Sequence, residues 1–300
     1  NNIVPYAPIQ KKILKDIVPF DPRKKIEWVS GVRLVSGEQI WIPAELVFSP
    51  PKPLRGSRKM CYRSSSNGVA AHFDKKMAVD TALYELIERD AFSVMWYAKR
   101  KVCAIPHQHL SAELQERMSR WNSFGYTVTV LDLTLDGPPV LLVLIWSHKK
   151  LPALVSGAGC KETFSDAVLK AFDEAEFMAM PWHRRKLRGN MNAYDINSPD
   201  DHGLFYADPR NLIHVEWLLK SKECKVAPID FSYNLNCFKP IVVDITPQKH
   251  RCGLTVVRVL SEKLMPINFG YGTEHYGHPR VTELQLRWSW MYPAIPHFFA

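Results

Sequence analysis

Two apolar segments joined by a rigid turn constrain the fold of this chain more than any other feature. Residues 127–133 and 140–146 are rich in Val, Leu and Ile and predict two β-strands, separated by Asp136-Gly137-Pro138-Pro139. The second segment is far shorter than the roughly 20 apolar residues that a membrane-spanning helix needs, so we expect no membrane partner. Helical patterns flank the pair at 74–100 and 165–180. Strands and helices therefore alternate irregularly, which predicts an α/β fold of mixed α+β layers rather than a regular parallel wound sheet.

Shorter elements are predicted around this pair. Strands are expected at 28–35, 39–48, 241–244 and 254–260, a helix capped by Asn211 is expected to reach about 222, and loops are expected at 49–66 and 195–210. Gly157-Ala158-Gly159 is expected to form a tight turn, in which backbone amides can approach a phosphate.

The composition is that of a globular chain. Apolar residues make up 46% of the sequence and charged residues 23%, which excludes a disordered tail, a coiled coil and a collagen-like rod. The formal net charge of +9 means that a polyanionic partner has to be weighed against a basic solvated surface. No basic motif interleaved with aromatic residues accompanies the charge, so we expect no nucleic acid partner.

The six cysteines are widely scattered, and no two of them have the two-residue gap of a zinc knuckle or redox motif. A chain of this size also needs no disulfide to fold. We therefore expect no zinc site, and thiols that are buried or idle in a reducing, cytoplasmic environment.

The segment 81–90 combines two carboxylates with an arginine. On a helix, Thr81, Glu85 and Glu88 fall within about 60° of one another, with Arg89 on the flank and the apolar residues opposite. Such a face can hold a hard divalent cation through oxygen ligands, and the guanidinium suits phosphate oxygens. The alternative is a solvated helix face whose glutamates pair with lysines.

A second acidic helix strengthens the first interpretation. On the helix predicted at 165–180, Glu174 shares a face with Ala167 and Ala171, which leaves room for a ligand. Glu176 lies about 160° away around the axis, so it is expected on the surface.

Several segments along the chain match one family in order. They are 28–31, 42–47, 65–70 with its Ser-Asn-Gly turn, the positions Thr81, Glu85, Glu88 and Arg89, the glycine pair with Glu174, 256–260, 266–270 with Arg280, and 293–300. Together they resemble the YcaO family of ATP-using enzymes that modify peptide backbone amides. The resemblance runs from about residue 20 to the last residue, so we expect a YcaO domain at 21–300 and a partial N-terminal segment or linker at 1–20.

The resemblance implies a cytoplasmic cyclodehydratase that uses ATP and Mg²⁺ to form thiazoline or oxazoline rings in a ribosomally made peptide, as in bacteriocins and thiazole/oxazole-modified microcins. It places the ATP site between sheets and acidic helices. By residue it implies Mg²⁺ ligands (Glu85, Glu88, Glu174), nucleotide contacts (Ser66, Asn67, Thr81), phosphate contacts (Arg89, Arg280), and a tail whose His297 and Ala300 carboxylate lie near the reacting amide.

Partners are implied as well. They are a precursor peptide, a leader-binding domain resembling ubiquitin-activating enzymes, and a flavin dehydrogenase that oxidises azolines. A thioamide- or amidine-forming enzyme, a non-catalytic peptide-docking subunit and a basic nucleic-acid binder are the alternatives.

Three positions depart from the family pattern. Thr81 replaces a serine and keeps the hydroxyl, Phe177 stands where a glutamine is usual, and Phe298 and Ala300 replace two prolines of the tail.

Overall fold

A computed structural model of the protein describes residues 18, 21, 23, 25–48, 62, 64–184, 191–224, 233–247, 252–275, 278, 280 and 295–299. The chain divides into two compact units, which are described separately. The first consists of 1–93, 234–268 and 272–287, and the second of 94–233, 269–271 and 288–300.

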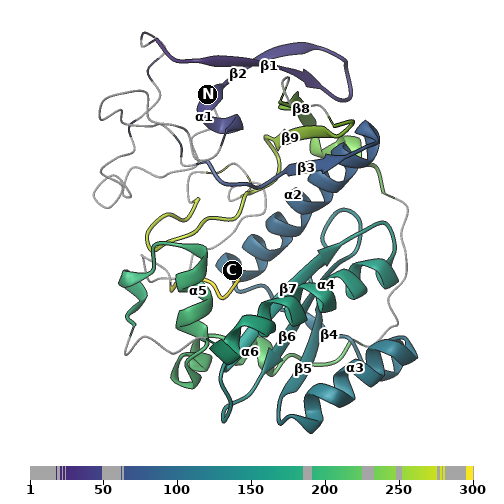
Figure 1. The fold of residues 1–300 in the computed structure, drawn as a ribbon, viewed down its shortest axis with the longest axis vertical. Helices are drawn as coiled ribbons and strands as arrows, with labels where there is room; N and C mark the ends of the chain where they lie inside the picture. The colour runs from purple at the N-terminus through teal and green to yellow at the C-terminus, as the bar shows by residue number, and fades with distance from the viewer. Residues whose placement is uncertain are drawn as a thin grey trace. The chain divides into compact units, whose positions relative to one another are not determined.

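The first unit contains a five-stranded antiparallel sheet in the order β2-β1-β8-β9-β3 (Figure 1). Its strands are β1 (Trp28–Arg33), β2 (Gln39–Pro43), β3 (Val69–His72), β8 (Pro240–Asp244) and β9 (Thr255–Ser261). A short helix, α1 (Ala44–Val47), follows β2, and the long helix α2 (Lys75–Ala98) follows β3, with residues 94–98 of α2 assigned to the second unit. The strand predicted at 39–48 was too long, because Pro43 cannot donate to the ladder and instead precedes the first turn of α1.

The second unit contains a four-stranded antiparallel sheet in the order β4-β5-β6-β7 (Figure 1). Its strands are β4 (Cys103–Ala104), β5 (Thr127–Asp132), β6 (Val140–Trp146) and β7 (Leu154–Cys160). The apolar pair predicted from the sequence is β5 and β6, and residues 140–145 are all fully buried. Helices α3 (Ala112–Ser123) and α4 (Phe164–Ala179) share one core with the sheet, formed by alternate residues of β5 and β6. The prediction of mixed α+β layers is confirmed.

Three helices of the second unit lie where the sequence predicted a loop followed by a single helix. They are α5 (Pro199–Tyr206) and α6 (Glu216–Leu219), together with a 3₁₀ helix at Pro209–His214 that Asp208 caps. The helix expected from Asn211 is therefore divided in two, and α5 replaces an expected loop. A sequence signal for α5 exists: Ser198 and Asp201 form a reciprocal capping box, with Pro199 at the first helical position. Further 3₁₀ helices are His107–His109, Met180–Arg184, Ala193–Asp195 and Leu235–Phe238.

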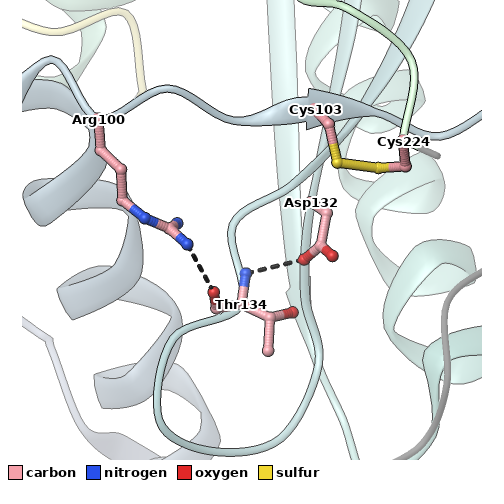
Figure 2. The surroundings of a disulfide bond; sticks show 5 residues. All are labelled: Arg100, Cys103, Asp132, Thr134 and Cys224. Carbon is pink, nitrogen blue, oxygen red and sulfur yellow. Dashed lines mark hydrogen bonds between the residues drawn. A yellow bond between two sulfur atoms is a disulfide. The ribbon is translucent and has the colours of Figure 1, made fainter. Parts of the chain in front are cut away.

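The expectation that the thiols are idle was wrong for one pair. Cys103 on β4 and Cys224, which follows α6, form a disulfide across a sequence separation of 121 (Figure 2). Backbone hydrogen bonds bring the two segments together, since Ala104 donates to Lys222 and Cys224 donates to Ala104, each at 2.8 Å. Cys160 is buried, as expected, and Cys237 and Cys252 are exposed.

Two hydrogen bonds stabilise the β5–β6 hairpin beside the disulfide (Figure 2). Arg100 donates to the Thr134 carbonyl at 3.1 Å, and the Asp132 carboxylate accepts from the Thr134 N–H at 2.9 Å. Among the described residues, none of the helices is both long enough and apolar enough to cross a membrane.

Candidate functional site

The predicted acidic face lies on α2 in the first unit. Leu83, Leu86 and Ile87 are buried, as the helical pattern predicts. The Glu88 side chain is only 1% exposed, whereas that of Glu85 is 24% exposed. Arg89 lies beside both: its Nη2 is 3.8 Å from Glu85 Oε1, and its Nε is 3.9 Å from Glu88 Oε1.

This burial bears on what the face does. A carboxylate in a desolvated position is costly unless a cation compensates it. Arg89 supplies a positive charge beside the two carboxylates, and Arg258 also interacts electrostatically with Glu85. The cluster therefore combines carboxylate oxygens, which suit a divalent cation, with nearby positive charges. Thr81 is exposed one turn before Glu85, on the same side of the helix.

The Ser-Asn-Gly turn is locked onto this face. The Gly68 N–H donates to Glu85 Oε2 at 3.0 Å, and the Gly68 carbonyl accepts from the Val259 N–H at 2.7 Å. Gly68 has φ +75°, and a Cβ there would lie 2.4 Å from the Val259 oxygen, so only glycine fits. The turn therefore orients the Glu85 carboxylate.

The two other residues of this turn differ in accessibility. Ser66 is exposed, whereas Asn67 is 4% exposed and donates from its side-chain amide to the Ile267 carbonyl at 3.0 Å. The turn thus brings Ser66 and Asn67 into the same unit as Glu85, and their nucleotide contacts stay predictions.

Arg258 was not among the predicted site residues. It is 2% exposed on β9 and donates from Nη1 to the Ser65 carbonyl at 2.7 Å. Burial lowers its pKa, and the nearby Tyr62 and Glu85 oppose that effect. A single arginine within the apolar strand 256–260 was the available sequence signal.

A cavity of about 240 Å³ opens beside this turn. Its walls are mainly apolar, with contributions from β2, α1, β8 and Leu86 of α2, and its polar lining includes Asn67, Arg258, Tyr62 and His278. Small-ligand sites commonly combine apolar walls with a few convergent polar groups in this way.

Arg280 contacts a different side of α2, through Asp90. It is 5% exposed and donates from Nε and Nη2 to Asp90 Oδ2 at 3.1 and 2.8 Å, while Asp90 Oδ1 accepts from the Met265 N–H at 2.8 Å. Asp90 is about 140° around the helix from Glu85. The structure thus places Arg280 in a buried ion pair away from the Glu85 side of α2, and its phosphate contact stays a prediction.

Three titratable side chains that lie close to Arg280 in the sequence, Glu274, His275 and His278, are also buried. Burial lowers the pKa of His275 to about 3 and that of His278 to about 4, and it raises the pKa of Glu274 to about 7. Both histidines are therefore neutral near pH 7. Within the part of the chain that the structure describes, no three His, Cys, Asp or Glu side chains are grouped as a metal site.

In the second unit, the predicted glycine turn is a strand. Gly157 and Gly159 lie in β7, and a Cβ on them would fall 2.3 Å from the Ala175 nitrogen and 2.0 Å from the Ala167 oxygen, respectively. The expected tight turn was wrong, because these glycines instead allow the backbone of α4 to approach the strand closely. The Ala158 N–H between them donates to Glu174 Oε2 at 3.1 Å.

Glu176 fastens α3 to α4. It accepts from Arg117 Nη2 at 2.8 Å and from Trp121 Nε1 at 2.9 Å. It is therefore partly buried rather than a simple surface residue, and it faces away from Glu174. Phe177, which stands where a glutamine is usual, is 64% exposed.

The tail segment, residues 295–299, is packed into the second unit. His297, Phe298 and Phe299 are each at most 3% exposed. Ala300 lies outside the described residues. Glu174 and His297 thus belong to the second unit, whereas Ser66, Asn67, Thr81, Glu85, Glu88, Arg89 and Arg280 belong to the first.

The family follows from comparison with known proteins. A family model described as YcaO cyclodehydratase, ATP- and Mg²⁺-binding, matches residues 4–265, and the chain belongs to this family. An uncharacterized protein of Methanothermobacter thermautotrophicus is 28% identical over 207 residues, which are 60% of this chain and 52% of that protein. The chain therefore spans about half the length of this curated relative.

Solved structures show the same fold. A heterocyclase in complex with substrate and cofactor has a TM-score of 0.73 at 19% identity, covering 93% of this chain and 40% of that one. YcaO from Methanopyrus kandleri, bound with AMPPCP and Mg²⁺, has a TM-score of 0.62 at 20% identity, covering 93% and 72%. A chain of the E. coli microcin synthetase McbBCD complex with pro-MccB17 bound has a TM-score of 0.67 at 15% identity, covering 86% and 72%.

Proposed function

We propose that this chain is the ATP-dependent cyclodehydratase component of a system that forms thiazoline or oxazoline rings in a ribosomally made precursor peptide. The observation that carries the proposal is the α2 face. There, a buried glutamate, a second glutamate held by the Gly68 N–H and an arginine within 4 Å of both carboxylates share one turn of helix. ATP and Mg²⁺ are the cofactors of the family.

The residues fit a magnesium-bound triphosphate. Carboxylate oxygens are the ligands that Mg²⁺ takes from proteins, and we assign Glu85, Glu88 and Glu174 to it. The Arg89 guanidinium is held between two carboxylates and lies where it can neutralise phosphate charge. Ser66 and Thr81 are exposed hydroxyls near Glu85 in the first unit, and we assign them, with Asn67, to the nucleotide.

The reaction needs no nucleophile from this chain. A Cys, Ser or Thr side chain of the peptide adds to the preceding amide carbonyl, and the resulting oxyanion takes the γ-phosphoryl group of ATP. Phosphate then leaves with that oxygen while the amide nitrogen, like the attacking side chain before it, gives up its proton, which yields the ring with its C=N bond, ADP and phosphate. The role of Arg89 and the carboxylates is to position the reactants and to stabilise the charge that develops during transfer.

Asp90 supports a second, structural role for Arg280. Two hydrogen bonds hold the Arg280 guanidinium on Asp90 of α2, and Asp90 also accepts from the Met265 N–H. We keep the phosphate contact of Arg280 as part of the proposal. We also propose that the tail, with His297 and the carboxylate of Ala300, aligns the reacting amide.

A precursor peptide, a leader-binding domain resembling ubiquitin-activating enzymes and a flavin dehydrogenase are the proposed partners. The neighbouring microcin synthetase acts as a complex and binds its precursor, which supports a multi-protein assembly. Within the family, thioamide or amidine formation is the alternative, with sulfide or an amine as nucleophile.

The test combines binding with product mass. The protein is titrated with Mg²⁺–ATP and then incubated with precursor and partners. Loss of one water per site in the peptide supports cyclodehydration, and exchange of one oxygen for sulfur marks thioamide formation instead. Glu113→Gln, at an exposed acid on α3 (71% exposed), is the control for the Glu88→Gln variant. A folded Glu88→Gln protein that binds Mg²⁺–ATP like the control refutes the metal assignment.

A further inference from the structure

Three consecutive carbonyls of the tail segment accept hydrogen bonds from buried side chains of the same unit. Trp96 Nε1 donates to the Ile295 carbonyl at 3.2 Å, and the Tyr206 hydroxyl donates to the Pro296 carbonyl at 2.6 Å. His202 Nδ1 lies 2.6 Å from the His297 carbonyl. All three contacts are therefore made to the backbone of the segment and not to its side chains.

The bonding of His202 settles its tautomer. The Gly270 N–H points at His202 Nε2 at 3.0 Å, so this nitrogen must be the acceptor. Nδ1 then carries the proton and donates it to the His297 carbonyl. A neutral His202 thus joins residues 269–271 to the tail segment through its two ring nitrogens.

The surroundings hold the ring in place. His202 is fully buried, its ring centroid is 4.3 Å from that of His297, and Phe269 packs edge-on against both imidazoles. Because the ring contacts both the backbone and the side chain of His297, a change at His202 displaces the His297 imidazole as well.

We propose that His202 is a positioning residue: it fixes the tail segment and the His297 ring in the orientation that cyclisation requires. The proposal rests on the proposed function for its catalytic consequence, because the tail is there assigned to alignment of the reacting amide. The hold on the tail itself is independent of that function. Trp96 and Tyr206 contribute to the same hold, but only His202 also touches 269–271.

Two conservative substitutions separate the two ring nitrogens. In His202→Asn the side-chain amide nitrogen can take the place of Nδ1 and keep the bond to the tail. In His202→Gln the side-chain amide oxygen can still accept from the Gly270 N–H, but the His297 carbonyl loses its hydrogen bond from residue 202. His214→Asn is the matched control, since His214 stacks on Phe205 in the same unit and, among the described residues, makes no hydrogen bond or ring contact with the tail segment.

The first measurement is amide hydrogen exchange of a peptide that contains residues 295–299, followed by mass spectrometry. We expect His202→Gln to raise its exchange rate roughly 5- to 150-fold, because an unpaired buried acceptor costs about 1–3 kcal/mol. His202→Asn should recover most of the protection, and His214→Asn should match the wild type. The β6 peptide serves as the reference for global opening.

The second measurement is the cyclisation rate with saturating precursor and Mg²⁺–ATP. His202→Gln should lower kcat at least tenfold with an unchanged KM for ATP, and His202→Asn should restore kcat. If exchange in His202→Gln stays within twofold of the wild type, the hold on the tail is refuted. If the tail opens but kcat is unchanged, or if β6 exchange rises equally in His202→Gln and His202→Asn, the positioning role is refuted. Absence of cyclisation in the wild type refutes the proposed function and leaves the exchange result standing.

Discussion

Removing the Cys103–Cys224 disulfide should lower the stability of the second unit. The bond closes a loop with a sequence separation of 121, for which chain entropy gives a stabilisation of about 4.9 kcal/mol at 25 °C. That value is an upper bound here, because hydrogen bonds through Ala104 still link the two segments when the sulfurs are separate. We therefore expect a loss of about 2–5 kcal/mol, which for a unit of this size lowers Tm by about 5–20 °C.

The assay is thermal unfolding followed by circular dichroism, with and without a phosphine reductant. Cys237→Ser and Cys252→Ser form the background, because both thiols are exposed and could react. The Cys103→Ser, Cys224→Ser variant should have the Tm of the reduced protein, and this Tm should not change when the reductant is added. Equal Tm values for oxidised and reduced protein would refute the reasoning.

Three further outcomes are expected. Glu88→Gln should abolish peptide-stimulated ATP hydrolysis with an unchanged circular dichroism spectrum, since it removes a charge with almost no change in volume; near-normal turnover contradicts the metal assignment. Gly159→Ala should cost at least about 3 kcal/mol in urea unfolding, because its Cβ would lie 2.0 Å from a backbone oxygen of α4, and a loss below 1 kcal/mol would show that β7 and α4 can separate. Burial lowers the pKa of His202 to about 4, although the hydrogen bond to the His297 backbone and the Asp201 carboxylate oppose this shift, and the His297 ring faces the His202 ring. Protection of the tail segment should therefore be complete above about pH 6.5 and be lost as the pH falls toward 4; pH-independent protection contradicts this.

Local patterns predicted much of the fold. The apolar strands β5 and β6 and the helices α2 and α4 were predicted within a few residues of their observed bounds, because their periodicity and flanking turns are properties of the segment itself. The grouping of Glu85, Glu88 and Arg89 on one side of α2 followed from helical geometry in the same way.

The features that the sequence did not predict depend on contacts between residues that are far apart in the chain. The contact of Glu85 with Gly68 depends on a turn that pairs with β9, about 190 residues later. Gly157-Ala158-Gly159 suits a turn or a strand equally well until α4 is known to pack on it. The roles of His202 and Cys224 likewise arise from contacts that cross about 95 and 121 residues, which no local pattern encodes.

The backbone amides that orient two glutamates bear on which cation the carboxylates can take. Glu85 and Glu174 each have their Oε2 engaged by a backbone N–H, from Gly68 and Ala158 respectively. Each of these hydrogen bonds uses one lone pair of a carboxylate oxygen, which disfavours coordination of a cation by both oxygens of that carboxylate. Calcium favours wide coordination shells with two-oxygen carboxylates, whereas the smaller magnesium ion accepts single oxygens in an octahedron. Under the proposed function, each main-chain amide therefore makes its own glutamate a better ligand for magnesium than for calcium.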